Sequence, residues 1–493
     1  MIHRPKVLFI SFSNLTLGVD IISETISGHY DSYHLVMLDY GDFSYYRNKP
    51  LYPDRSELDR ISEFCSGFDY VAISSFSSLK DVTFALSDII RKNTSAKVII
   101  GGYLGIIEPE ECRPHCDYVC VWEGEYFLEL LDALESGKTP DVLINFISED
   151  TRIKTIICSK DFSEIPSPTF KIFRKNYYYI NKRIYEFDDY NPYMFYLESA
   201  RGCPYSCTFC SNDYTNRFKR ENNIPQIRIK PVETLIKEID NVSHMAKSIF
   251  FVDDNFFVRN TEDVAEFVKG FSRYKNIKLS LHIDMRSAGF LEKFRLLSRL
   301  KNVTVVIGIQ SGSDRIRREI YKRNITSEKI YYLDKMMKDI LVENGSDLII
   351  RYQFILLNPL ETRQDIIDTV NMISRMRSYS EAFIYYDMPK TEMKECLSRK
   401  GLSENSTSFY HSSIKKKYLF YYFYVFFLTR LMRRKMNPKR AFKDSKITRF
   451  LDKRFFYGFY GFIIRLILVK NQADFNRITI KNILRSKHKL VRI

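Results

Sequence analysis

The sequence lacks the segments that would place the protein in a membrane or carry it out of the cell. No uncharged apolar run approaches the roughly 18 residues of a membrane-spanning helix, and the apolar stretch 7–10 is too short for the core of a signal peptide. Nine cysteines, an odd number in a chain of 493 residues, argue against a disulfide framework. We therefore expect a cytoplasmic protein, in which clustered cysteines indicate metal binding before they indicate disulfides.

The N-terminal part of the chain has few basic residues, and the C-terminal part has few acidic residues. Residues 1–150 carry 12 basic and 24 acidic side chains, a net charge of −12, whereas residues 401–493 carry 22 basic and 4 acidic, a net charge of +18. The formal charge of +16 therefore comes mostly from the C-terminal part. An apolar content of 45% excludes a mostly disordered chain, and the length predicts more than one domain.

The first 140 residues alternate between β-rich runs and helical patterns. We predict strands at 7–11, 33–38, 70–74, 96–100 and 117–121, with helices at 80–92 and 125–134. Such alternation predicts a doubly wound, Rossmann- or flavodoxin-like α/β domain with parallel strands. Ligands bind these sheets at the carboxyl ends of the strands, so the loops after the first, third, fourth and fifth strands are candidate binding loops.

Other motifs of this region are weaker. Gly101-Gly102 would allow a ligand to approach the backbone closely, but a tight turn explains the pair more simply. The dinucleotide-binding sequence GxGxxG is missing after the first strand. Three cysteines spaced by four residues (Cys112, Cys116 and Cys120) look like metal ligands, yet Pro114 interrupts any helix that would align them, and we interpret them as core residues.

The strongest signal is a CxxxCxxC arrangement of Cys203, Cys207 and Cys210, directly after a β-rich run at 193–197. Thiolates are the usual ligands of iron–sulfur clusters. Three of them on one loop suit three irons of a 4Fe–4S cluster and leave the fourth iron open to a non-protein ligand. A structural zinc usually needs four protein ligands, and His244, the nearest later histidine, is far away in the sequence.

This segment resembles the radical S-adenosylmethionine (SAM) superfamily in its cysteine spacing, in Gly202-Cys203-Pro204 and in Phe209 before the third cysteine. Runs similar to strands of that family follow at 248–256, 279–286, 303–314, 351–362 and 384–391. The resemblance implies a partial (β/α), TIM-like barrel over 191–402, a 4Fe–4S cluster on the three cysteines, and SAM on the open iron. The reduced cluster would then cleave SAM to a 5′-deoxyadenosyl radical.

Through the resemblance, five residues become candidate SAM contacts: Phe209, Asp254, Arg286, Gln310 and Ser311. Gln310 replaces the usual Glu, which removes a negative charge but keeps hydrogen-bonding capacity. Asp253 and Asp254 are adjacent on a strand and should point to opposite faces, so at most one reaches the barrel interior. Asn358 stands near a usual Gly, and Asn tolerates left-handed backbone.

Alternation in the run 279–286 places its polar residues on one face and its apolar residues on the other. The polar face consists of Ser280, His282, Asp284 and Arg286. A polar inner face is what an active site inside a barrel requires. Arg286 is then a candidate partner of the SAM carboxylate, with an ordinary surface salt bridge as the alternative.

The N-terminal region resembles the cobalamin-binding domain that precedes many radical SAM enzymes. The similarity lies in a strand ending in Gly-Gly, a Pro-Glu-Glu helix start at 109–111, Cys-Asp-Tyr-Val at 116–119 and Glu-Gly-Glu at 123–125. It implies cobalamin contacts at Asn14, Ser75, Gly101, Gly102, Glu123 and Gly124. The DxHxxG motif, whose histidine ligates cobalt from below, is missing, and 14–18 reads Asn-Leu-Thr-Leu-Gly at the corresponding place.

The basic C-terminal extension, residues 403–493, lies outside the resemblance, which covers roughly residues 1–402. Its apolar, aromatic-rich cores at 418–428 and 455–464 are flanked by basic residues. This pattern fits helices that cap the barrel or lie in a membrane interface. Nucleic-acid binding is not expected, because the aromatics are not interleaved with the charges.

The resemblances and the composition of the C-terminal part together predict four parts: a cobalamin-binding domain at 1–140, a linker at 141–190, the barrel at 191–402 and a helical extension at 403–493. They imply a class B radical SAM methyltransferase-like enzyme that methylates an unactivated carbon of a small molecule or natural product, with flavodoxin or ferredoxin as the electron donor. Cobalamin-dependent rearrangement, cyclisation or sulfur insertion is the alternative reaction. A cluster-binding sensor without turnover is the alternative of another class.

Overall fold

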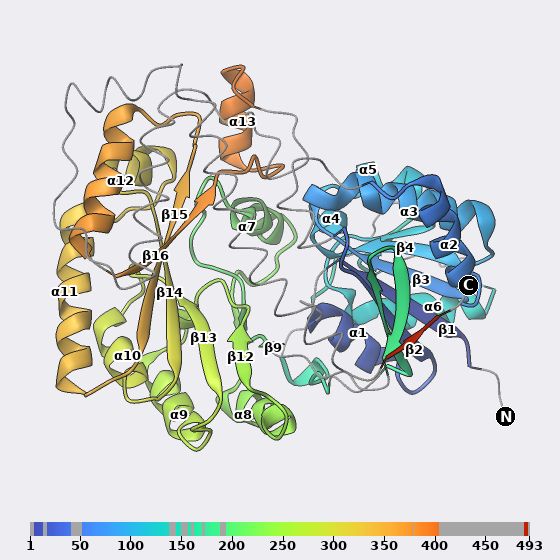
Figure 1. Ribbon diagram of the computed structural model, residues 1–493, viewed down its shortest axis with the longest axis horizontal. Helices are drawn as coiled ribbons and strands as arrows, with labels where there is room; N and C mark the ends of the chain where they lie inside the picture. Colours follow the sequence, from blue (N-terminus) through green and yellow to red (C-terminus); the bar gives the residue numbers. More distant parts are fainter. Residues whose placement is uncertain are drawn as a thin grey trace. The chain divides into compact units, whose positions relative to one another are not determined.

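A computed structural model describes residues 4–12, 17–40, 52–137, 144–148, 156–158, 162–169, 173–187, 194–376, 378–403 and 488–491. These residues form two compact units, which Figure 1 shows in colours that follow the sequence. The first unit comprises 1–193, 221–224 and 472–493, and the second comprises 194–220 and 225–471. Among the described helices, none has the length and apolar character needed to cross a membrane. Most of the C-terminal extension, 404–487, lies outside the described residues.

The first unit is built on a nine-stranded sheet. Its strands are β1 (Lys6–Ser11), β2 (Asp31–Met37), β3 (Tyr70–Ser74), β4 (Lys97–Gly101), β5 (Tyr118–Cys120), β6 (Phe146–Ile147), β7 (Lys175–Ile180), β8 (Arg183–Phe187) and β17 (His488–Leu490). The central strands are parallel in the order β7-β2-β1-β3-β4-β5. The order 2-1-3-4-5 is that of flavodoxin-like sheets, which confirms the predicted α/β domain.

Helices cover both faces of this sheet, so its strands are apolar on both sides. The helices are α1 (Leu17–Ile26), α2 (Arg55–Cys65), α3 (Lys80–Asn93), α4 (Gly102–Ile107), α5 (Pro109–Cys112) and α6 (Phe127–Glu135). In β1, Leu8 and Ile10 enter one core, and Val7 and Phe9 enter the other. This two-sided burial explains why the strands read as continuous apolar runs.

The segment 141–190, predicted to be a linker, contributes three strands to the same sheet. β6 pairs antiparallel with β5, β7 pairs parallel with β2, and β8 pairs antiparallel with β7. β17, from the end of the chain, adds one more antiparallel strand beside β8. The first unit is therefore larger than the predicted 1–140, because its sheet recruits distant segments at its edges.

The second unit contains a six-stranded sheet in which every neighbouring pair is parallel. The strands follow chain order: β9 (Phe195–Leu197), β12 (Ser248–Phe251), β13 (Lys278–Ile283), β14 (Val303–Gln310), β15 (Ile349–Leu356) and β16 (Tyr379–Ile384). The helices are α7 (Ser211–Glu221), α8 (Val232–Ser243), α9 (Thr261–Phe271), α10 (Phe290–Leu297), α11 (Ser327–Glu343), α12 (Arg363–Met376) and α13 (Glu392–Arg399). A two-stranded ribbon joins β10 (Ala200–Arg201) and β11 (Arg228–Ile229). Strand, helix and parallel strand in succession are the partial barrel that the sequence predicted.

The faces of β13 are as the alternation predicted. Leu279, Leu281 and Ile283 are buried, whereas Ser280 and His282 are only half-buried. The strand ends at Ile283, and Asp284 begins a turn in which the Ser287 N–H donates to the Asp284 carbonyl at 3.0 Å. Asp284 thus lies in the loop at the carboxyl end of β13, where active sites of barrel folds lie.

Candidate active site

The cysteine loop runs from the end of β9 to the start of α7, and a buried carboxylate anchors its first turn. Asp253, which follows β12, accepts hydrogen bonds from Ser199 N at 2.6 Å, from the Ser199 hydroxyl and from Ala200 N at 3.2 Å. The buried guanidinium of Arg259 donates to the Ser199 carbonyl at 2.6 Å. Asp253 therefore orders the loop, whereas Asp254 is exposed; both residues follow β12, which ends at Phe251.

The far end of the loop is fastened to the segment after β14 and to α13. Thr208 donates from its hydroxyl to the Ile320 carbonyl at 2.6 Å and accepts from Met393 N at 2.9 Å. The ring of Phe209 packs edge-on against Tyr321, with centroids 4.6 Å apart. At Gly202 the backbone is left-handed (φ 105°), and a Cβ there would overlap with the Gln226 carbonyl. The loop thus has a defined path between fixed points.

The three cysteines lie on this anchored loop as free thiols, Cys203 and Cys207 buried and Cys210 half-buried. Burial, assisted by the charge of Asp254, raises the pKa of Cys203 and that of Cys210 to about 12. Such thiols stay protonated at neutral pH until a metal displaces the proton. No three described His, Cys, Asp or Glu side chains are placed to hold a single metal ion. Three free thiols on one anchored loop are the donor set of a 4Fe–4S cluster, in which each thiolate binds a different iron.

Two arginines and a carboxylate surround Cys207. Arg286 Nη2 and Arg323 Nη1 each lie 3.6 Å from Cys207 Sγ. Asp284 binds both guanidiniums, at 2.8 Å to Arg286 and 3.0 Å to Arg323. Burial alone would raise the pKa of Asp284, but Arg323 and Arg286 hold it well below its usual range. Sequence reasoning missed Arg323, which lies after β14 and outside the run 303–314 that resembles the family.

Of the predicted SAM contacts, Phe209, Asp254 and Arg286 lie at the cysteine loop. The charge of Asp254 reaches Cys203 and Cys210. Burial by neighbouring protein atoms raises the pKa of Asp254, although the residue stays exposed to solvent. Arg286 is held by Asp284 and stacks on Tyr205, with its guanidinium carbon 3.6 Å from the ring centroid. Their SAM contacts stay predictions.

Gln310 and Ser311, at the end of β14, differ in their access. Gln310 has a left-handed backbone (φ 73°), and its amide folds over Gly308, where a Cβ would collide with it. Ser311 is fully buried, and its hydroxyl accepts from Ser313 N at 3.2 Å. The Ser311 side chain therefore belongs to the interior packing of this loop in the present structure.

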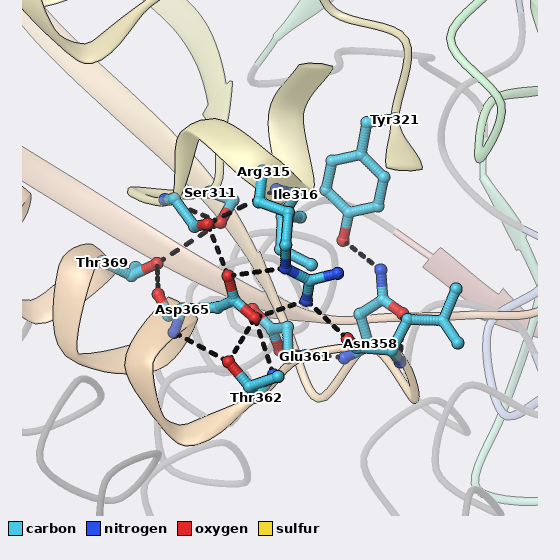
Figure 2. A network of polar contacts seen from close by, with 11 residues as sticks. Ser311, Arg315, Ile316, Tyr321, Asn358, Glu361, Thr362, Asp365 and Thr369 are labelled. Atoms are coloured by element: carbon cyan, nitrogen blue, oxygen red, sulfur yellow. Dashed lines mark hydrogen bonds and ion pairs between the residues drawn. The ribbon is translucent and has the colours of Figure 1, made fainter. Parts of the chain in front are cut away.

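A polar network, shown in Figure 2, ties the loop after β14 to the start of α12. Asp365 is its centre: it accepts from Ser313 Oγ at 2.5 Å, from Arg315 Nη2 at 2.5 Å and from Thr362 N at 2.7 Å. Gly312 N donates to Thr369 Oγ1 at 2.8 Å. These bonds hold the two loops that follow β14 and β15 in one arrangement.

Asn358 belongs to the same network, but the left-handed residue is its neighbour Leu357 (φ 65°). Asn358 instead donates from Nδ2 to the Tyr321 hydroxyl at 3.0 Å and accepts from Leu360 N at 2.9 Å. The expectation that Asn358 supplies the left-handed backbone is therefore wrong. Its amide links the β15 loop to the tyrosine that supports the cysteine loop.

In the first unit, the described candidates for cobalamin contacts lie at the carboxyl ends of β3, β4 and β5. Ser75 is buried and shares a hydrogen bond of 2.7 Å with Thr83 Oγ1. Gly102 is left-handed (φ 74°), and a Cβ there would lie 2.7 Å from the Ser75 carbonyl; a Cβ at Gly124 would lie 2.5 Å from Ile22. Internal packing therefore explains both glycines.

Two further candidates of that set have other surroundings. A Cβ added at Gly101 would lie 3.3 Å from the Cβ of Cys120, so this glycine too is explained by packing. The carbonyl of Glu123 accepts from Asn145 Nδ2 at 2.9 Å. Asn14 lies outside the described residues. Cobalamin contacts at these positions stay predictions.

Two aromatic rings that sequence reasoning missed lie at the same edge. Phe76 follows β3 and Tyr103 follows β4; they are 39% and 42% exposed and stack with centroids 6.2 Å apart. An exposed aromatic pair at the carboxyl edge of a flavodoxin-like sheet suits a large flat ligand such as a corrin ring. The sequence offered a signal, since each aromatic stands two residues after the end of its strand.

Three cysteines of the first unit are core residues, as predicted. Cys112, Cys116 and Cys120 are buried, and burial raises the pKa of Cys116 and of Cys120 to about 12. The Cys120 thiol donates to the Trp122 carbonyl at 3.3 Å. They pack as small apolar side chains.

Comparison with known proteins gives a family model and several relatives. Residues 197–373 match the model described as Radical SAM superfamily. An uncharacterised methyltransferase of Pyrococcus horikoshii is 26% identical over 347 residues, which are 66% of this chain and 69% of that protein. The tRNA-2-methylthio-N(6)-dimethylallyladenosine synthase of Methylacidiphilum infernorum is 25% identical over 199 residues, 38% of this chain and 40% of that enzyme. The chain thus spans less than half of this second relative.

Solved structures of one protein share the fold. They are of TsrM, a radical S-adenosylmethionine methyltransferase from Kitasatospora setae. The structure with cobalamin and a [4Fe-4S] cluster bound has a TM-score of 0.60 and 11% identity, covering 96% of this chain and 99% of that chain. The structure with tryptophan and a SAM analogue has a TM-score of 0.57 and 11% identity, covering 80% and 76%. At this identity the likeness concerns the fold.

Proposed function

We propose that this chain, whose residues 197–373 match the model of the Radical SAM superfamily, is a cobalamin-dependent radical SAM methyltransferase. The cluster would bind through Cys203, Cys207 and Cys210, and SAM would bind at its open iron. Cobalamin would bind at the carboxyl edge of the first sheet. When bound, these groups supply a 5′-deoxyadenosyl radical and a transferable methyl group, which is chemistry that side chains lack.

The protein's own residues would fix and shield these groups. Asp253 and Arg259 hold the beginning of the cysteine loop, and Thr208 and Phe209 hold its end. The polar face of β13 and its loop, with Asp284 and Arg286, would line the side of the SAM site. An electron would come from an external one-electron donor such as flavodoxin or ferredoxin.

The observation that carries the proposal is the pairing of two folds in one chain. A flavodoxin-like sheet with the order 2-1-3-4-5 precedes a six-stranded parallel barrel whose first loop holds the cysteine triad. The same combination supports cobalamin because the solved structure that covers 96% of this chain holds cobalamin and a cluster. Phe76 and Tyr103 add a surface for a flat ring at the expected edge.

Histidine ligation of cobalt from below is not part of the proposal. The described C-terminal edge of the first sheet carries no histidine, and the described His34 of β2 lies buried, 2.9 Å from Ser11 Oγ. We propose that the residues at this edge would hold the corrin without supplying an imidazole to cobalt. A cob(II)alamin spectrum of the bound cofactor without nitrogen splitting in electron paramagnetic resonance would support this, and nitrogen splitting that changes when the protein's histidines carry 15N would contradict it.

A test of the proposed function needs no substrate. The reconstituted full-length enzyme is incubated with cob(I)alamin and SAM that carries a labelled methyl group. Labelled methylcobalamin, formed faster than without enzyme, is the expected result. Unaccelerated formation, in enzyme that contains both the cluster and cobalamin, would contradict methyl transfer.

Sulfur insertion is a second candidate, because several relatives are tRNA-2-methylthio-N(6)-dimethylallyladenosine synthases at 21–27% identity. Their similarity covers only 38–40% of this chain, so it does not indicate that this chain acts on tRNA. We place a small-molecule substrate first, as tryptophan is for the fold relative. Mass spectrometry separates the candidates, since only insertion adds sulfur to the product.

A further inference from the structure

The charges around the three cysteines are unevenly distributed. Cys207 Sγ lies 3.6 Å from a guanidinium nitrogen of Arg286 and 3.6 Å from one of Arg323. Cys210 Sγ has a neutral donor, Asn212 Nδ2, at 3.6 Å. The negative charge of Asp254 acts on both Cys203 and Cys210 and raises the pKa of each thiol. Among the three thiols, Cys207 is therefore the one with two guanidinium groups at hydrogen-bonding distance.

Both arginines are held firmly in place. Arg323 is buried and donates to the Gly308 carbonyl at 2.6 Å and to Asp284 Oδ2 at 3.0 Å. Arg286 donates from Nε to Asp284 Oδ1 at 2.9 Å and from Nη2 to Asp284 Oδ2 at 2.8 Å. Two guanidiniums and one carboxylate leave one net positive charge beside Cys207. Because the carboxylate binds both arginines, neither can turn away without losing an ion pair.

We propose that Arg286 and Arg323, positioned by Asp284, raise the reduction potential of the 4Fe–4S cluster through N–H···S hydrogen bonds to Cys207. Hydrogen bonds to the sulfurs and net charge are main determinants of such potentials. A donor withdraws electron density from the thiolate, and a nearby positive charge stabilises the added electron. Both effects favour the cluster that has accepted one electron from an external donor.

Arg286, Arg323 and Asp284 are positioning residues, because they would act on the cluster through Cys207, which would bind the iron. The proposal rests on the cluster assignment of the proposed function and is independent of cobalamin and of methyl transfer. It also gives Asp284 a role that sequence reasoning did not assign. Asp284 keeps two like charges side by side on one sulfur.

The test compares two neighbouring residues with the same charge. Arg323→Gln removes one positive charge and the donor to Cys207. Lys322→Gln removes one positive charge from a side chain that is exposed and pairs with Glu392 at 2.6 Å. The midpoint potential is measured by spectroelectrochemical titration of the reconstituted full-length protein without SAM, and iron content is measured for every variant.

We expect Arg323→Gln to lower the reduced-to-oxidised ratio at the wild-type midpoint by about tenfold, which is a shift of 59 mV to more negative potential. Lys322→Gln should leave the midpoint unchanged, because an exposed charge is screened by solvent. Arg323→Lys, which keeps the charge but not the forked donor geometry, should lie between the two.

Two results would overturn the proposal: an unchanged midpoint in Arg323→Gln, or an equal shift in Lys322→Gln. Arg286→Gln reports on the second N–H···S bond and replaces Arg323→Gln if that variant binds no iron. If both variants fail to bind iron while Lys322→Gln binds it, the arginines are needed for assembly and the tuning proposal is rejected. Failure of the wild type to form a cluster would instead reject the cysteine triad itself.

Discussion

At the residue scale, the sequence identifies ligands better than it identifies the residues that support them. The three cysteines stand out because their spacing is local. Arg323 does not stand out, because its approach to Cys207 depends on the loops after β13 and β14 meeting at the barrel edge. Asn358 shows the same limit: its residue type suggested left-handed backbone, whereas its amide serves two hydrogen bonds.

Gln310 gives a prediction at this scale. If it only donates and accepts hydrogen bonds, Gln310→Glu should change the SAM dissociation constant by less than about tenfold, or ~1.4 kcal/mol. Glu keeps the length of the side chain that folds over Gly308. Calorimetric titration of SAM into cluster-loaded protein measures this, with Gln310→Ala as the control that removes hydrogen bonding. Markedly weaker binding by the Glu variant would show that the neutral amide is required.

His34 predicts how stability depends on pH. Its ring is buried, stacks on Phe173 with centroids 5.0 Å apart, and burial lowers its pKa to about 3. The unfolded state binds the proton more tightly, so the free energy of unfolding falls as the pH drops below about 6.5. Between pH 7 and pH 5 this one group should cost about 2 kcal/mol.

His34→Gln checks that prediction. Gln retains a hydrogen bond to Ser11 but does not titrate, so the difference between pH 7 and pH 5 should shrink by the same amount. Denaturant unfolding of the two proteins at both pH values measures it. An equal pH dependence in wild type and variant would show that His34 is not the responsible group.

At the scale of elements, most strands and helices could be predicted because their patterns are regular. The helix predicted at 80–92 is α3 (Lys80–Asn93), since its buried apolar positions repeat with helical spacing. The last strand was expected within 384–391, but β16 is Tyr379–Ile384, because its partner β15 pairs with it from Arg351 onward and ends at Leu356. β17 could not be predicted, because its partner β8 lies about 300 residues earlier and no local pattern records that pairing.

Gly312 gives a prediction for the contact between the β14 loop and α12. A Cβ at Gly312 would overlap with the backbone of Thr369 in α12. Gly312→Ala should therefore lower the free energy of unfolding by about 1–3 kcal/mol, the usual cost of overpacking. Gly28→Ala is the control, because a Cβ there meets nothing and a change within about 0.5 kcal/mol is expected. Equal unfolding free energies for wild type and Gly312→Ala would show that the loop moves without cost.

At the scale of the whole molecule, the charge belongs to a part whose structure is not described. The net charge of +18 lies in 401–493, and only 401–403 and 488–491 of that range are described. β17 shows that the end of this extension returns to the first unit's sheet. The choice between a cap and a membrane contact for the aromatic cores at 418–428 and 455–464 therefore stays open to experiment.

Liposome flotation tests the membrane alternative on the full-length protein. Vesicles with anionic lipids should carry the protein upward if the basic and aromatic cores dock in the interface, and neutral vesicles should carry less. A variant in which Lys415, Lys416 and Lys417 are changed to Gln should float less. Absence of flotation with anionic vesicles would remove the membrane contact and favour the cap.

The most direct test of the central claim is release of 5′-deoxyadenosine from SAM by the reduced, reconstituted enzyme. The account predicts release by the wild type and by Cys112→Ala, whose cysteine lies in the core. It predicts no cluster and no release for Cys207→Ala. SAM cleavage retained by Cys207→Ala would contradict the assignment of the triad, and no release by cluster-loaded wild type, with or without candidate substrates, would favour a sensor over an enzyme.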